Sequence, residues 1–123
     1  MADRFMHTVL TPAVLDAERR YYGRTYPAFE VTPEPDVLTA GEVEFIAQRD
    51  SFYMATITEN GWPYLQHRGG AKGFLCVTGP SQLMFADHGG NRQMISVGSL
   101  SVNDRVSLFL MDYPARERLK ILG

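Results

Sequence analysis

Several features that would assign this sequence to a class are missing. It has a single cysteine, Cys76, so no internal disulfide can form, and a reducing cytoplasm is the expected compartment. No apolar run reaches the roughly 18 residues of a membrane-spanning helix, and the first residues lack the apolar stretch of a signal peptide. The net charge of −2 gives no basic excess of the kind that nucleic-acid-binding domains carry. We therefore expect neither a membrane nor a nucleic acid as a partner.

Lysine is also scarce, and the histidines are scattered. Of the 12 basic residues only Lys72 and Lys120 are lysines. Arginine suits bidentate contact with phosphate or carboxylate, but a GC-rich coding sequence gives the same bias, so position matters more than number. The three histidines do not have the spacing of metal ligands, and no metal site is expected. Cys76 lies between Leu75 and Val77 and is expected to be a small core residue.

The length of 123 residues fits one domain. Residues 1–38 are predicted to be an N-terminal helix and an irregular arm, and 39–123 the folded domain. In the arm, Thr11 and the proline after it predict the start of a helix that ends at Gly23.

The rest of the chain has the patterns of short strands. A capping box at Thr39 to Glu42 predicts a short helix, and Asn60-Gly61 is a strong hairpin signal. A second helix is expected over 91–100. The expected strands are 52–58, 63–68, 74–78, 82–86, 105–112 and 117–122. This pattern predicts a mainly β fold, a small antiparallel barrel with flanking helices.

One glycine-rich basic loop follows the strand at 63–68. Strand alternation places Gln66 and Arg68 on one face and His67 on the other. Arg68 and Lys72 flank glycines whose backbone N–H groups could face an anion. A plain hairpin loop with two solvated cations is the alternative.

A second such loop covers residues 87–93. Asn91 is a good helix N-cap, and it would place Arg92 in the first turn, beside N–H groups that favour phosphate. A solvated arginine next to an ordinary cap is the alternative. Two loops of this kind at strand ends suit a phosphorylated planar ligand.

Four segments, in this order, resemble the pyridoxamine 5′-phosphate oxidase-like family of FMN-binding split barrels. They are Phe52-Tyr-Met-Ala-Thr56, Gly61-Trp-Pro-Tyr-Leu-Gln-His-Arg-Gly-Gly70, Phe85-Ala-Asp-His-Gly-Gly-Asn-Arg92 and Leu110-Met-Asp112. The resemblance implies a six-stranded Greek-key split barrel and a homodimer with FMN in clefts between the subunits. It also implies redox chemistry at the flavin ring.

The resemblance assigns cofactor contacts by position. One strand would line the flavin, the next would pass its ring, and residues 91–93 stand where the oxidase has Ser-Arg-Lys on the phosphate, with Lys72 as a replacement for the missing charge. No catalytic residue is assigned, and the strand-end carboxylates of Asp50 and Asp112 are open candidates for a proton donor. The implied cofactor residues are Gln66, His67, Arg68, Lys72, Ala86, Asp87, Asn91, Arg92 and Gln93, with Ser96 and Ser99 as weaker candidates.

Two departures from the oxidase argue against oxidation of pyridoxamine phosphate. Its first phosphate motif, an arginine followed five residues later by a lysine, is absent, as is its C-terminal Arg-x-His segment. Because relatives often continue past this point, truncation of a longer chain is left open. The sequence predicts an FMN-dependent oxidoreductase that acts on an unidentified small molecule, with a nicotinamide nucleotide as one possible donor. The alternatives are a non-catalytic flavin, deazaflavin or haem binding protein, and a barrel whose cofactor site has decayed.

Overall fold

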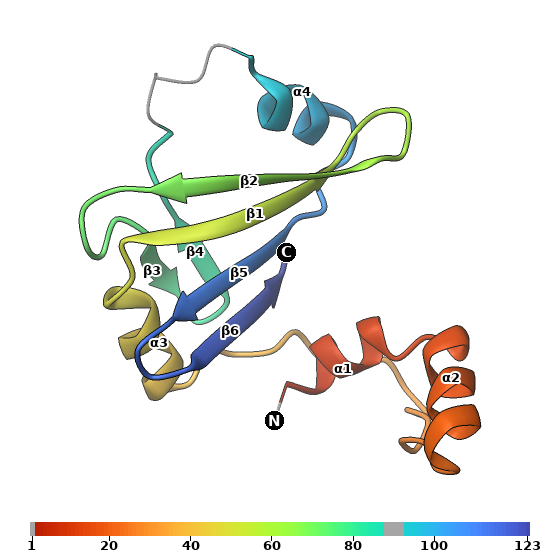
Figure 1. Ribbon diagram of the computed structural model, residues 1–123. Helices are drawn as coiled ribbons and strands as arrows, with labels where there is room; N and C mark the ends of the chain where they lie inside the picture. Colours follow the sequence, from red (N-terminus) through yellow and green to blue (C-terminus); the bar gives the residue numbers. More distant parts are fainter. Residues whose placement is uncertain (1, 88–92) are drawn as a thin grey trace. The chain divides into compact units, whose positions relative to one another are not determined.

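The computed structural model of the chain describes residues 2–87 and 93–123 (Figure 1). The chain divides into two compact units, Met1–Val37 and Leu38–Gly123, and each is considered by itself. Within the described residues, no helix combines the length and the apolar character needed to cross a membrane.

The first unit holds two helices, α1 (Asp3–Val9) and α2 (Pro12–Tyr22). Helix α2 begins and ends as the sequence predicts, because the Thr11 hydroxyl accepts the Val14 N–H and Gly23 closes the helix in the left-handed conformation. The sequence did not reveal α1. Its N–H groups at Arg4 and Phe5 are capped by the carboxylate of Asp36, more than 30 residues away. Neither helix has a buried residue.

The second unit combines two helices with six strands. Helix α3 (Ala40–Ala47) starts at the predicted capping box, in which the side chains of Thr39 and Glu42 each accept the other's backbone N–H. The strands are β1 (Ser51–Ile57), β2 (Pro63–Gly69), β3 (Cys76–Gly79), β4 (Gln82–Met84), β5 (Ser107–Asp112) and β6 (Glu117–Leu122), and α4 (Ile95–Val102) lies between β4 and β5 in the chain.

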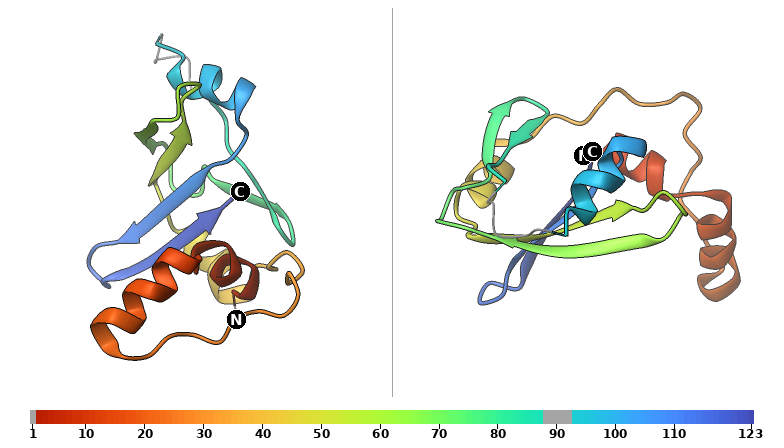
Figure 2. Two further views of the ribbon diagram at one scale, coloured as in Figure 1. Left: turned by 90° about the vertical axis from the view of Figure 1, so that its right-hand side faces the viewer. Right: turned by 90° about the horizontal axis from the view of Figure 1, so that it is seen from above.

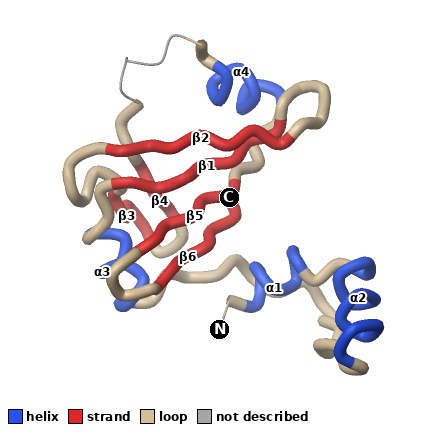
Figure 3. Tube along the Cα trace, viewed as in Figure 1, coloured by secondary structure: helices blue, strands red, loops and turns tan. Residues whose placement is uncertain are grey.

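Four of the strands form one antiparallel sheet in the order β2-β1-β5-β6 (Figures 1 and 3). Strand β5, which has apolar residues on both faces, is interior. The inner face carries Phe52, Met54, Leu108 and Leu110, and the opposite, outer face carries Tyr53 and its neighbours. Strand β2 is an edge of this sheet, so its inward side chains lie at the margin of the core.

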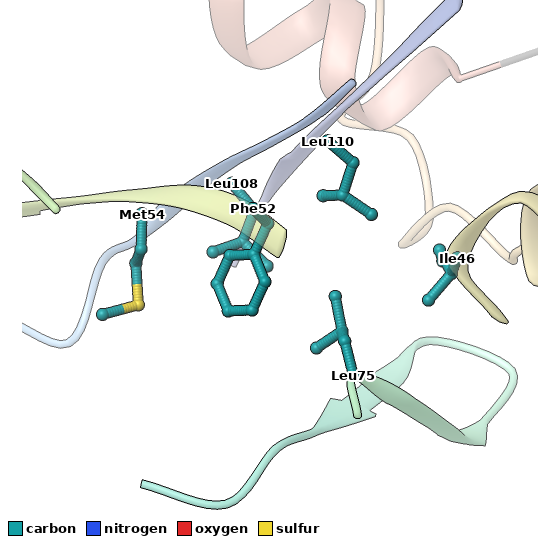
Figure 4. Close-up of a cluster of buried hydrophobic side chains, with 6 residues drawn as sticks. All are labelled: Ile46, Phe52, Met54, Leu75, Leu108 and Leu110. Atoms are coloured by element: carbon teal, nitrogen blue, oxygen red, sulfur yellow. The ribbon is translucent and has the colours of Figure 1, made fainter. Parts of the chain in front are cut away.

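The core forms where the inner face meets α3 and the segment leading into β3. Ile46 of α3 and Leu75 point toward Phe52 of β1 and Leu110 of β5, and all four are almost completely buried (Figure 4). The core therefore holds α3 and the β3–β4 hairpin against one side of the sheet.

The predicted fold class is confirmed only in part. The described residues form six strands whose pairs are all antiparallel, but their content of helix and strand is mixed rather than mainly β. Within residues 2–87 and 93–123, β3 and β4 pair only with each other, as a ribbon separate from the four-stranded sheet (Figure 2), and no closed barrel forms.

Two local predictions were wrong. The helix expected over 91–100 begins at Ile95, because Met94 has a φ of 58° and cannot continue a right-handed helix. Cys76 is exposed, since Leu75 and Val77 point inward and strand alternation turns the thiol outward. Its sulfur lies 3.5 Å from the carbonyl oxygen of Gly73.

The loop between β2 and β3 depends on a glycine. A Cβ on Gly70 would lie 2.8 Å from Cγ of Phe74, whose ring stacks on Phe52 with centroids 5.6 Å apart. We expect Gly70→Ala to lower the free energy of unfolding by about 1–3 kcal/mol, because the ring must shift within the core. Urea denaturation measures it.

Gly98 provides the matched control. It lies inside α4, and a Cβ there would meet no atom within 4 Å. Gly98→Ala should therefore stabilise the protein by about 0.5–1 kcal/mol. Equal destabilisation by both substitutions would show that contact with Phe74 is not the cause.

Candidate functional site

Arg68 is the centre of the polar group on the inner face of β2. The burial of alternate residues along this strand confirms that Gln66 and Arg68 point inward, opposite Met54 and Phe52 of β1. Only 16% of the Arg68 side chain is exposed, although the residue lies on an edge strand. A guanidinium that is so largely shielded from water requires hydrogen-bond partners within the protein or on a ligand.

Four side chains from three segments meet here, and we call them the Arg68 cluster: Gln66, Arg68, Asp87 and Ser96. Arg68 Nη1 lies 2.5 Å from Oδ1 of Asp87, and Nη2 donates to Oε1 of Gln66 at 3.1 Å. The hydroxyl of Ser96 in α4 donates to the same Gln66 oxygen at 2.9 Å. Gln66 thus links the strand to the first turn of α4 and fixes the guanidinium.

One donor of the cluster is left over. Arg68 Nε is buried and has no hydrogen-bond partner among residues 2–87 and 93–123. Most buried polar groups in proteins are paired, so an unpaired N–H on a cation calls for an explanation. An acceptor atom of a ligand would satisfy it.

Aromatic rings form the apolar wall beside this donor. The Arg68 guanidinium carbon lies 5.7 Å from the centroid of the Phe85 ring. Phe85 packs edge-on against Phe52, with centroids 5.1 Å apart, and Phe52 stacks on Phe74. The cluster therefore offers a cation, hydrogen-bonding groups and an aromatic edge in one place. Phe85 was not among the predicted site residues, although it lies two residues before Asp87, in the segment that follows β4.

A second unpartnered polar atom lies on the same inner face. The Thr56 hydroxyl of β1 is buried and forms no hydrogen bond with any residue that the structure describes. Thr56 is level with Tyr64, whereas Arg68 is level with Phe52, so four residues of β1 separate the two positions. At about 3.3 Å per residue this is roughly 13 Å, too far for one small group to contact both.

The structure divides the sequence-predicted residues into three groups. It brings Gln66, Arg68 and Asp87 together and adds Ser96, which was a weaker candidate. Lys72, Ala86 and Gln93 have exposed side chains, and the described contacts of the cluster include neither Lys72 nor Ala86. Asn91 and Arg92 lie outside the described residues, so their expected role on a phosphate stays a prediction. Ser99 is buried in α4.

His67 lies on the outer face, away from the Arg68 cluster. Its ring packs edge-on against Tyr53 at 5.4 Å, and the Tyr53 hydroxyl lies 3.3 Å from that of Tyr113. This hydrogen bond raises the pKa of Tyr113 above its ordinary value. One ligand group cannot contact His67 and Arg68 of the same subunit across the sheet.

Asp112 has a structural partner. Its carboxylate lies 3.2 Å from Nη2 of Arg49 and accepts the N–H of Ala115 at 3.1 Å. The role of proton donor that the sequence left open has no support here. Among residues 2–87 and 93–123, no three potential metal ligands come together.

The first unit contains a separate hollow of about 440 Å³. It is lined by Glu18, Tyr22, Arg24, Thr25 and Tyr26, none of which the sequence singled out. Tyr22 and Tyr26 are exposed, so the hollow is an open surface feature rather than an enclosed site.

No family model, curated protein or solved structure matches this chain. A functional proposal therefore stands on the chain's own residues and their geometry.

Proposed function

We propose that this protein is an FMN-binding flavoprotein, an oxidoreductase of the pyridoxamine 5′-phosphate oxidase-like group that acts on a small molecule other than pyridoxamine phosphate. The observation that carries the proposal is the Arg68 guanidinium, mostly buried and left with an unpartnered Nε. The antiparallel strands and the two-sheet arrangement support a split barrel, since such a barrel need not close completely.

The residues present fit one acceptor-rich edge of a flavin nucleotide. Arg68 offers a fixed cationic donor, while Gln66 and Ser96 hold it in place. Phosphate and carbonyl oxygens both accept such N–H bonds, and a charge-assisted bond is stronger than a neutral one. The rings of Phe85 and Phe52 supply an apolar surface beside the donor.

Bound FMN would supply the electron-transfer chemistry, which amino-acid side chains lack. The chain's own part is to bind and orient. Arg68 would neutralise negative charge on the ligand, Gln66 would maintain the guanidinium's direction, and the aromatic wall would exclude water. A cation held in a partly dry site acts on charge more strongly than one in water.

We further propose a cytoplasmic homodimer. The outer face of the sheet supports the second copy, because apolar side chains are exposed there, with Leu65 of β2 at 64%. Leu122 of β6 and Tyr113 beyond β5 are also exposed. The mass of the FMN-loaded protein in light scattering tests this part, and a monomer contradicts it.

The absorption spectrum of the purified protein tests the cofactor. We expect the two visible bands of a flavin, release of FMN on heat denaturation, and uptake of FMN by stripped protein with a dissociation constant in the micromolar range or below. A Soret band would identify haem instead. A colourless protein that takes up no FMN would contradict the proposal.

A non-catalytic binding protein is the second candidate. It is favoured by one feature of the described residues: Asp87 is the only acidic side chain in contact with Arg68, and His67 lies on the other face. No obvious proton donor thus accompanies the cluster. Sustained oxidation of NADH or NADPH with a soluble acceptor would argue against this candidate.

A further inference from the structure

Arg68 already carries an anionic partner of its own. Asp87 contacts Nη1 through Oδ1, and within the described part of the chain no other carboxylate contacts the guanidinium. The Asp87 side chain is 57% exposed, whereas that of Arg68 is 16% exposed. The acidic partner is therefore the one that can move into water at little cost, while Arg68 remains fixed by Gln66.

From this asymmetry we propose that Asp87 is a specificity-determining residue: it occupies Arg68 as an internal competitor and excludes simple inorganic anions. The inference rests on the proposed function, because it concerns ligand choice at the same cluster. The resemblance implies a different role for Asp87, in which its strand passes the flavin ring.

The competition follows from charge and donor number. A phosphate ion approaching Arg68 meets a carboxylate within hydrogen-bond distance of the guanidinium, so it must either displace Asp87 or accept repulsion from it. An isolated phosphate can accept the Nε–H, but it brings its negative charge against the carboxylate and has no apolar part to contact the aromatic wall. A flavin that presents a neutral carbonyl oxygen to Nε is repelled much less by the carboxylate, and it also gains contact with the aromatic wall at Phe85.

A specificity role and a purely structural one predict opposite results. If Asp87 merely positions Arg68, its removal leaves the guanidinium less ordered, and anion binding weakens. If Asp87 competes, its removal frees a donor that Gln66 continues to hold, and anion binding strengthens.

The test uses inorganic phosphate as the probe and Asp87→Asn as the variant, in the full chain at constant ionic strength. Asparagine keeps the size of the side chain and removes the charge. Isothermal titration calorimetry should show phosphate binding that is about 10- to 100-fold tighter than in the wild type, the range expected for removing one negative charge at this separation. FMN affinity should change less, so preference for FMN over phosphate falls.

Glu59→Gln is the matched control. It removes the same charge from an exposed position in the β1–β2 turn, at the opposite end of the hairpin from Arg68, and phosphate affinity should not change. Asp87→Ser provides a second test if the asparagine variant folds poorly. Unchanged or weaker phosphate binding by the folded variants overturns the inference, as does a failure of both variants to bind phosphate.

The two proposals fail separately. FMN binding by the wild type with no gain of phosphate binding in Asp87→Asn would support the flavin proposal and contradict the role of Asp87 as a competitor. Tighter phosphate binding by Asp87→Asn in a protein that never binds FMN would support the role of Asp87 as a competitor and contradict the flavin proposal.

Discussion

Arg68→Ala is expected to weaken FMN binding by about 10- to 150-fold. This range corresponds to the ~1.5–3 kcal/mol of a charge-assisted hydrogen bond. The substitution removes the largely buried cation on the inner face of β2. It also leaves the Asp87 carboxylate without its partner, so that its charge repels an anionic ligand. Quenching of flavin fluorescence during titration of stripped protein measures the affinity.

Two variants separate the Arg68 site from a general effect of charge. Arg68→Lys retains the charge but not the planar set of donors, so its affinity should lie between those of the wild type and the alanine variant. Arg20→Ala makes the same change of net charge at an exposed position of α2, in the first unit. FMN affinity in that variant should match the wild type, and an equal loss in both alanine variants would contradict a specific site.

Elements whose signals are local could be predicted from the sequence. The Thr11 cap, the Thr39–Glu42 capping box and the Asn60-Gly61 turn each depend on residues within a few positions of one another. Strand alternation likewise separated Gln66 and Arg68 from His67. Backbone geometry sets these relations before any tertiary contact forms.

Features that depend on distant residues could not be predicted in this way. Helix α1 is capped by Asp36 from the far end of the first unit, and Arg68 meets Asp87 across 19 positions of sequence. The start of α4 depended on the left-handed conformation of Met94, which no residue preference indicates. The sequence could predict residues of the site, but only the fold shows that the Asp87 carboxylate contacts the Arg68 guanidinium.

The same limit applies to Arg49, whose contacts no local pattern in the sequence indicates. Its side chain, 13% exposed, extends from the end of α3 to the end of β5. It donates to the carbonyl oxygens of Phe45 and Met111, both at 3.1 Å, and pairs with Asp112. Its guanidinium carbon also lies 4.4 Å from the centroid of the Phe45 ring. One side chain thus joins a helix to the central strands on which the core is built.

We expect Arg49→Met to lower the free energy of unfolding by about 3 kcal/mol. Methionine keeps much of the apolar stem, so the loss reflects the hydrogen bonds and the carboxylate left without its cation, for which removal of one member of a buried pair typically costs 3–5 kcal/mol. We expect the lower end of this range because the Asp112 side chain is 26% exposed, so water can partly solvate the carboxylate once Arg49 is gone. Urea denaturation should show a lower midpoint with an unchanged slope.

Asp112→Asn measures how much the charge of the carboxylate contributes to the free energy of unfolding. This variant keeps a side-chain oxygen for the N–H of Ala115 and loses only the charge, so we expect a cost of about 1 kcal/mol. In the double variant the unpaired carboxylate is gone, and the total cost should fall below the sum of the two single costs by about 1 kcal/mol or more. Strict additivity would show that Arg49 acts through its contacts with Phe45 and Met111 alone, and a cost below about 1 kcal/mol for Arg49→Met would contradict its role as a link between α3 and β5.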